Sequence, residues 1–172
     1  VDGLPKADQI IESDTFRGSA VTDFGRLGHM PDYLVEYTSG GCFHLDKLIN
    51  DDFFEATKTL FNAGHYVSMA NLLMSCIDTL AFVEHGDKNG NFVEWLASYC
   101  ELDALGVTAE ELWEFRNSLL HMTNLHSRKV VRGQCSQLTP YIASIDATIP
   151  TNTGDTNPFN LFALVHDVAA GA

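Results

Sequence analysis

Apolar residues that recur every three or four positions between residues 45 and 122 are the strongest constraint on how this chain folds. This spacing places them on one side of an α-helix, whereas a half-buried strand would alternate with a period of two. The clearest run covers residues 66–84, and similar runs cover 45–62, 92–102 and 108–122. We therefore expect a mostly α protein with a four-helix core.

Glycine and proline limit the regular pattern at both ends of the chain. Residues 1–40 contain several of each and predict an irregular N-terminal arm, and Gly64 ends the first helical run. After the last helical run, Val130–Arg132 and Leu138–Ile145 favour a small extended or hairpin segment. Residues 150–158 predict a loop, and residues 160–169 a final short helix.

These patterns predict three parts within one domain of 172 residues. The parts are an N-terminal arm (1–40), a helical core (41–127) and a C-terminal extension packed on the core (128–172). The N-terminus lacks a signal-peptide pattern, and no run of 18 apolar residues predicts a membrane span. The four cysteines form no Cys-x-x-Cys pair, which is typical of reduced thiols in a cytoplasmic protein.

Charge is unevenly distributed along the chain. The formal net charge is −13, which disfavours nucleic acid at long range. Residues 115–145, however, contain no acid and four bases, namely Arg116, Arg128, Lys129 and Arg132. This basic segment gives mild support to contact with RNA, and the last three of these residues are the candidate RNA-binding side chains.

The same basic segment begins inside a predicted helix with an unusual group of polar side chains. Thr108 to Glu111 fits a capping box, so the helix should begin there and continue to Met122. Asn117 and His121 are four residues apart and share a face, and the long side chain of Arg116 can swing to it. Arginine suits phosphate and histidine exchanges protons near neutral pH. The residue types fit RNA cleavage without a metal, although they equally suit an ordinary helix C-terminus.

A second polar feature lies on the helix predicted at residues 66–84. Ser68, Asn71, Ser75 and Asp78 form a polar row on a helix that is otherwise strongly apolar. The row predicts a functional groove or an interface, and plain exposure to solvent is the equally weighted alternative.

The pattern Arg116-Asn117-x-x-x-His121 resembles the Arg-polar-x-x-x-His signature of the HEPN superfamily. The order of helices before it is similar too, and the resemblance covers residues 44–126. The segment Glu114–Met122 looks like the motif helix of bacterial HEPN proteins. The resemblance implies a compact helical homodimer in which the two motif helices face each other.

The resemblance also implies roles for individual residues. Many HEPN proteins are metal-independent endoribonucleases of toxin–antitoxin, defence or RNA-processing systems, whereas others have lost activity and bind or regulate partners. Arg116 and His121 would form the catalytic pair, and Asn117 would orient the site. Asp78 could hold Arg116 in place, although no motif position supports that transfer. An antitoxin or another protein partner is then expected besides RNA.

Two alternatives stay open on the sequence. One is a catalytically inactive HEPN-like dimeric module whose acidic surface meets a basic protein. The other is a metal-dependent helical enzyme using His44, His65 or His85, and His121, but no His-x-x-x-His or Glu-x-x-His spacing supports it. No Gly-rich phosphate loop and no nucleophile elbow is present, so we expect neither a metal nor a cofactor.

Overall fold

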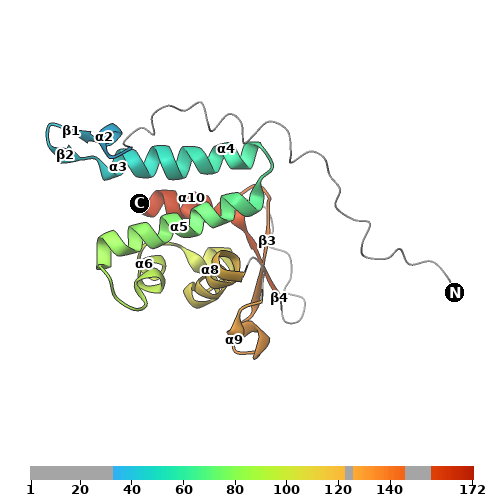
Figure 1. The fold of residues 1–172 in the computed structure, drawn as a ribbon. Helices are drawn as coiled ribbons and strands as arrows, with labels where there is room; N and C mark the ends of the chain where they lie inside the picture. Colours follow the sequence, from blue (N-terminus) through green and yellow to red (C-terminus); the bar gives the residue numbers. More distant parts are fainter. Residues whose placement is uncertain (1–32, 123–125, 146–155) are drawn as a thin grey trace, which may run out of the picture. The chain divides into compact units, whose positions relative to one another are not determined.

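The computed structural model describes residues 33–122, 126–145 and 156–172, and helices predominate among them (Figure 1). Contacts between Cα atoms divide the chain into two compact units, Val1–His44 and Leu45–Ala172. The prediction of a mostly α protein is therefore confirmed, and the candidate site belongs to the second unit.

The described part of the first unit is a short helix followed by a hairpin. The helix is α2 (Tyr33–Glu36), and the strands β1 (Thr38–Ser39) and β2 (Cys42–Phe43) pair antiparallel. Gly40 and Gly41 connect them with φ angles of 60° and 79°, which only glycine adopts easily at both centres of a tight turn. The rest of the predicted N-terminal arm lies outside the described residues.

The second unit opens with the helix predicted at residues 45–62, but its middle is wider than an α-helix. It consists of α3 (Leu45–Leu48), the π-helical segment η3 (Ile49–Glu55) and α4 (Ala56–Asn62). The predicted break follows, because Gly64 has a φ angle of 75°. A π-helix bonds residue i to i+5, and a three-four apolar spacing does not predict it.

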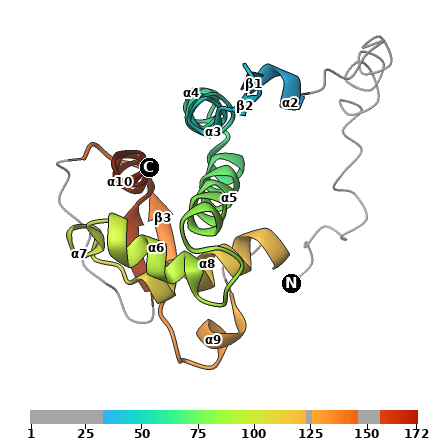
Figure 2. The same ribbon diagram turned by 90° about the vertical axis from the view of Figure 1, so that its left-hand side faces the viewer.

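The central element is α5 (Tyr66–His85), which contacts η3, α4, α6, α8 and α10. Figure 2 shows α4 on one side of α5 and α6 and α8 on the other. Of the described helices, α5 alone has the length and hydropathy of a membrane span, and these criteria also fit the core helix of a soluble protein. The apolar stripe predicted for residues 66–84 is largely buried, with Ala70, Leu73 and Ile77 at most 3% exposed.

Three helices lead from α5 to the motif. They are α6 (Asn91–Tyr99), α7 (Leu102–Leu105) and α8 (Ala109–Met122). The predicted capping box forms at the start of α8: the Thr108 hydroxyl accepts from the Glu111 amide at 3.2 Å, and the Glu111 carboxylate accepts from the Thr108 amide at 2.8 Å. These bonds satisfy two amides that the first turn leaves unpaired, and so fix where α8 begins.

Three sequence-based expectations for the chain after α8 are wrong. Val130 and Val131 belong to the short helix α9 (Arg128–Val131), because the Ser127 hydroxyl accepts from the Val130 amide and starts a helical turn there. The strand β3 (Gln137–Tyr141) does form, but it pairs in parallel with β4 (Thr156–Asn160). A hairpin would be antiparallel, so that alternative is excluded. Residues 156–158, predicted as loop, are in β4.

The final helix agrees with the prediction for residues 160–169. It is α10 (Leu161–Gly171), and the Asn160 side chain accepts from the Phe162 amide at 3.1 Å. The same buried side chain donates to the carbonyl oxygens of Ala143 and Ser144 at 3.1 Å, which holds the chain after β3 against the start of α10. The fully buried core side chains come from α5, α6, α8, α10 and β4: Phe92, Phe159, Met69, Leu73, Met74, Ile77, Leu96, Leu112, Leu161, Leu164, Val168 and Cys76.

Candidate active site

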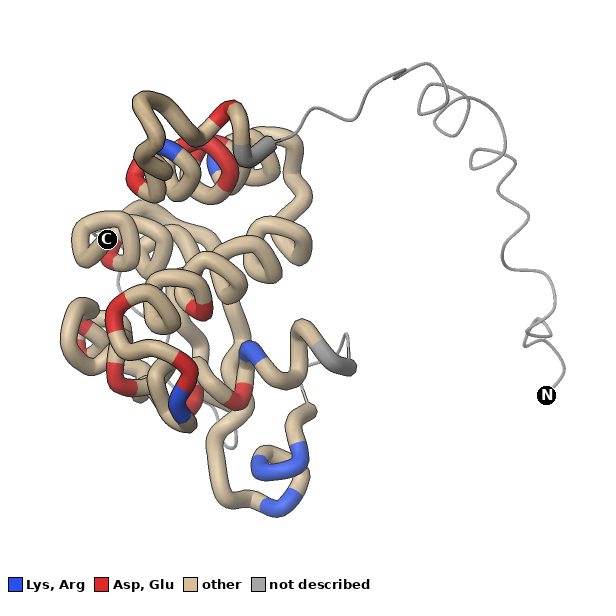
Figure 3. The backbone as a smooth tube through the Cα atoms, turned by 60° about the vertical axis from the view of Figure 1, so that its left-hand side comes forward, with Lys and Arg blue, Asp and Glu red and all other residues tan. Residues whose placement is uncertain are grey.

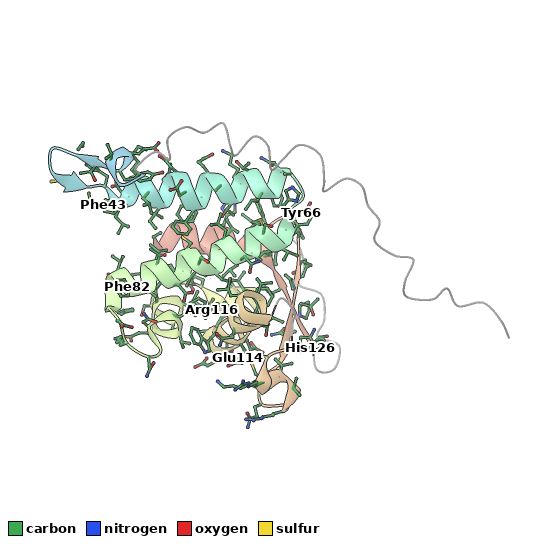
Figure 4. All side chains as sticks on the ribbon, viewed as in Figure 1. Phe43, Tyr66, Phe82, Glu114, Arg116 and His126 are labelled. Carbon is green, nitrogen blue, oxygen red and sulfur yellow. The ribbon has the colours of Figure 1, made fainter. Side chains whose placement is uncertain are left out.

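Arg116 on α8 and Asp78 on α5 form an ion pair between the two helices. The Arg116 Nε and Nη2 atoms both donate to Asp78 Oδ2, at 2.9 and 2.7 Å. The two side chains are only 18% and 31% exposed. The α5 helix therefore fixes the position of the guanidinium, and Figure 4 shows Arg116 between α5 and α8.

Two neighbours on α8 also contact the guanidinium of Arg116. Its Nη1 atom donates to Asn117 Oδ1 at 3.0 Å, and its Cζ atom lies 5.0 Å from the centre of the Trp113 ring. The ring face attracts the cation, and the amide orients the guanidinium plane. The guanidinium is thus restrained by a carboxylate, an amide and an aromatic ring.

The polar row on α5 is not a plain solvent-exposed face. Ser68 is exposed, whereas Asn71, Ser75 and Asp78 are half-buried. The Ser75 hydroxyl donates back to the Asn71 carbonyl at 3.0 Å, and the Asn71 side-chain oxygen is buried without a partner among the described residues. Buried acceptors are usually hydrogen-bonded, so this oxygen is an exception on α5.

His121 lies in the last turn of α8, and its side chain is outside the described part of the structure. Its place on the helix is nevertheless fixed by the spacing. His121 is one turn beyond Asn117, and it is two turns beyond Glu114 on nearly the same face. The segment 123–125 that follows also lies outside the described residues.

The three predicted RNA-binding residues do not share one environment. Lys129 Nζ lies 3.1 Å from Glu114 Oε1, and the Glu114 side chain is only 8% exposed. Arg128 and Arg132 are exposed at the two ends of α9. Figure 3 shows Lys and Arg, and no Asp or Glu, on the turn around α9. Lys129 therefore ties the basic turn to the motif helix, and the two arginines present the charge.

The Cys135 thiol lies beside this turn, and carboxylates of α8 affect its pKa. Burial raises the pKa of Cys135 above its ordinary value, and the negative charges of Glu111 and Glu114 raise it further. Cys135 is consequently a neutral thiol near neutral pH.

The metal-binding alternative finds no support where the structure can test it. In residues 33–122, 126–145 and 156–172 no three His, Cys, Asp or Glu side chains cluster in a way that could hold an ion. His65 is exposed at the start of α5, and His85 is half-buried at its end. The His121 side chain lies beyond this test.

Sequence reasoning missed Trp113 and Glu114. Trp113 had no predicted role, although its spacing of three residues from Arg116 predicts contact on a helix. Glu114 was predicted only as the first residue of the motif-helix segment, and no local signal in the sequence predicts its ion pair with Lys129. No protein-family model, curated protein or solved structure matches this chain.

Proposed function

We propose that the chain is a metal-independent endoribonuclease of the HEPN type that works as a homodimer. The motif Arg116-Asn117-x-x-x-His121 and the helical core support this proposal. In this proposal α4, α5, α6 and α8 correspond to the four-helix bundle of the superfamily. A toxin with a cognate antitoxin, or a defence or RNA-processing component, is the cellular role that the resemblance implies.

The single observation that carries the proposal is the restrained guanidinium of Arg116. It is bound by Asp78 and Asn117 and lies five residues before His121, about 7.5 Å along the helix axis. A cation held in place before substrate arrives stabilises charge in a transition state without reorganising, and such terms are usually the largest in catalysis.

The chemistry follows from the residue types. The 2′-hydroxyl of RNA attacks the adjacent phosphorus, the bond to the 5′-oxygen breaks, and a 2′,3′-cyclic phosphate forms. His121 takes the hydroxyl proton or gives a proton to the leaving oxygen, a step that contributes about 10²–10⁴-fold. Arg116 stabilises the negative charge that builds on the phosphoryl oxygens.

A homodimer would bring a second copy of His121 to the site as another proton-transfer group. Val67 and Phe82 are 61% and 56% exposed, and both lie on the α5 face that carries Asp78. Large apolar side chains on both sides of a polar site are typical of a contact surface. A two-fold axis here would bring both motif helices together, so that the two His121 residues could serve as acid and base.

The test is cleavage of single-stranded RNA and a tRNA pool in EDTA by the wild-type chain and by His121→Ala. We expect cleavage by the wild type and a loss of at least about 10²-fold in the variant. His65→Ala is the matched control, because His65 is exposed and its side chain caps no helix amide. Equal cleavage by the wild type and His121→Ala, or none by the wild type, would reject the proposal.

The second candidate is an inactive dimeric binding or regulatory module, and the Asp78 pair favours it. The carboxylate occupies two nitrogens of Arg116 and offsets its charge, which weakens attraction to phosphate. The net charge of −13 further suits a basic protein partner. This candidate predicts a stable dimer that leaves RNA intact, and the same assay distinguishes it.

A further inference from the structure

A groove of about 570 Å³ lies beside α9 and the start of β3. Its lining includes His126, Gly133, Gln134, Cys135, Ser136 and Gln137. Most of this lining is polar, unlike the groove between α4 and α10, whose walls are mainly phenylalanine and other apolar side chains. A polar groove of this size suits a ligand with several hydrogen-bonding groups.

The groove offers hydrogen-bonding groups that the fold does not use. In the described part of the chain, the side-chain amides of Gln134 and Gln137 make no hydrogen bond. Each amide presents a donor and an acceptor side by side, which matches the edge of a nucleobase. Gly133 adds an open stretch of backbone, because a Cβ atom there would meet nothing within 4 Å.

Basic side chains lie on the α9 side of the groove, whereas carboxylates of α8 act on its Cys135 side. Phosphates of a bound strand would therefore lie on the α9 side. Arg128 and Arg132 are exposed next to it, and no acid occurs in residues 115–145. Of the two α8 carboxylates that act most on the groove-lining Cys135, Glu111 and Glu114, the second pairs with Lys129 at 3.1 Å. Cys135 contributes a neutral thiol, since burial raises its pKa.

The ion pair of Lys129 and Glu114 also fixes the groove relative to the motif. Figure 4 shows Glu114 on the side of α8 that faces α9. Glu114 and His121 lie on nearly the same face of α8, separated by seven residues or about 10 Å along the axis. One extended RNA strand could therefore contact both the groove and the motif.

We propose that the groove holds one unpaired nucleobase of single-stranded RNA through Gln134 and Gln137, while Arg128 and Arg132 contact the flanking phosphates. The proposal rests on the proposed function and names its substrate class. Proteins read RNA sequence mainly at unpaired bases, by hydrogen bonds to their edges, whereas phosphate contacts give affinity without preference.

The test is binding of three labelled RNA homopolymers, of adenosine, cytidine and uridine, measured by fluorescence anisotropy at one salt concentration in EDTA. The full chain carries His121→Ala so that no RNA is cut. We expect about tenfold tighter binding of one homopolymer than of the weakest. Gln134→Ala/Gln137→Ala should remove this preference, whereas Arg128→Gln/Arg132→Gln should weaken all three equally.

Asn62→Ala/Asn89→Ala is the control, because both amides are exposed on other elements. If the double variant does not fold, Gln134→Ala alone serves as the test variant, because Gln134 is exposed in a loop and its substitution should not disturb the fold. Three outcomes would overturn the proposal that the groove holds a nucleobase: no RNA binding, equal binding of the three homopolymers, or a preference that the Gln variants leave unchanged. If the wild-type chain cleaves RNA but the Gln variants leave base preference unchanged, only the proposed role of the groove is rejected. If binding depends on the base but the wild-type chain does not cleave, only the proposed nuclease activity is rejected.

Discussion

The proposed nuclease depends most on Arg116, and the ion pair that restrains its guanidinium also weakens its attraction to phosphate. Asp78 holds the guanidinium through two nitrogens, but it also offsets the charge that a phosphate would meet. The pair is partly shielded from water, with side chains 18% and 31% exposed. Its contribution to stability should therefore fall between those of exposed and fully buried pairs.

Asp78→Asn tests this pair at the residue scale. The amide keeps the shape of the carboxylate but loses its charge, which leaves Arg116 half-buried without its counter-ion. We expect the free energy of unfolding to fall by about 1–3 kcal/mol, measured by urea denaturation. If Asp78 only positions Arg116, the remaining cleavage activity should fall through kcat, because substrate binding loses no direct contact.

Glu55→Gln is the matched control for Asp78→Asn. Glu55 pairs with Lys58 at 3.3 Å, and these side chains are 58% and 66% exposed. Removal of this charge should change the free energy of unfolding by less than about 0.5 kcal/mol. An equal loss in the two variants would mean that the pair of Asp78 and Arg116 is an ordinary surface contact.

At the scale of elements, the short helix α9 depends on the motif helix for its position. Lys129 reaches from α9 to Glu114, whose carboxylate is buried on α8. A buried carboxylate without a cation is unfavourable, so Lys129 stabilises both elements at once.

Lys129→Met, Glu114→Gln and the double variant form a thermodynamic cycle for this contact. We expect Lys129→Met to destabilise the chain and Glu114→Gln to relieve much of that loss, with a coupling of about 1 kcal/mol or more. The free energy of unfolding of all four proteins gives the coupling directly. Additive losses would show that α9 is held by other contacts.

The helices were predictable and the strand pairing was not. Helices α5 and α8 follow from apolar spacing and a capping box within their own sequence. The pairing of β3 with β4 joins Gln137 to Thr156 across a long connection, which no local pattern specifies. Val130 and Val131 have strong strand propensity, but the Ser127 cap outweighs it.

The site was predictable mainly where residues lie on one helix, and the contact of Asp78 with Arg116 was the one expectation that joined two helices. The spacing places Asn117 one turn before His121, and the polar row indicated Asp78 as an unusual acid on α5. The contacts of Arg116 with Asp78 and of Glu114 with Lys129 join separate elements, so only the packed core determines their geometry.

At the scale of the whole molecule, the proposed dimer makes Phe82 a test residue. It is one turn beyond Asp78 and 56% exposed. Phe82→Glu would place like charges on both sides of a two-fold axis, so we expect a shift from dimer to monomer, measured by light scattering after gel filtration. Val83→Glu is the control, because Val83 is 54% exposed but points about 140° away from Asp78. A dimer that persists in Phe82→Glu would place the interface elsewhere.

The rates at which the cysteines are labelled test the packing of the chain. Burial raises the pKa of Cys76 and of Cys100 to about 12, whereas Cys42 is exposed. At pH 8 a thiol reagent should label Cys42 rapidly and the half-buried Cys100 slowly, because little thiolate forms at Cys100. Cys76 should be labelled only after denaturation, because it is also fully buried. Mass spectrometry of the labelled peptides identifies each site. Rapid labelling of Cys76 in the native chain would contradict the packing of α5.

The most direct test of the proposed nuclease is the chemistry of the RNA ends that it produces in EDTA. Wild-type chain and Arg116→Ala are incubated with single-stranded RNA and a tRNA pool, and the product ends are identified by mass spectrometry. We predict 2′,3′-cyclic phosphate and 5′-hydroxyl ends from the wild type, and a rate at least about 10²-fold lower in Arg116→Ala. Products with 5′-phosphate ends, or cleavage by Arg116→Ala at the wild-type rate, would contradict the account.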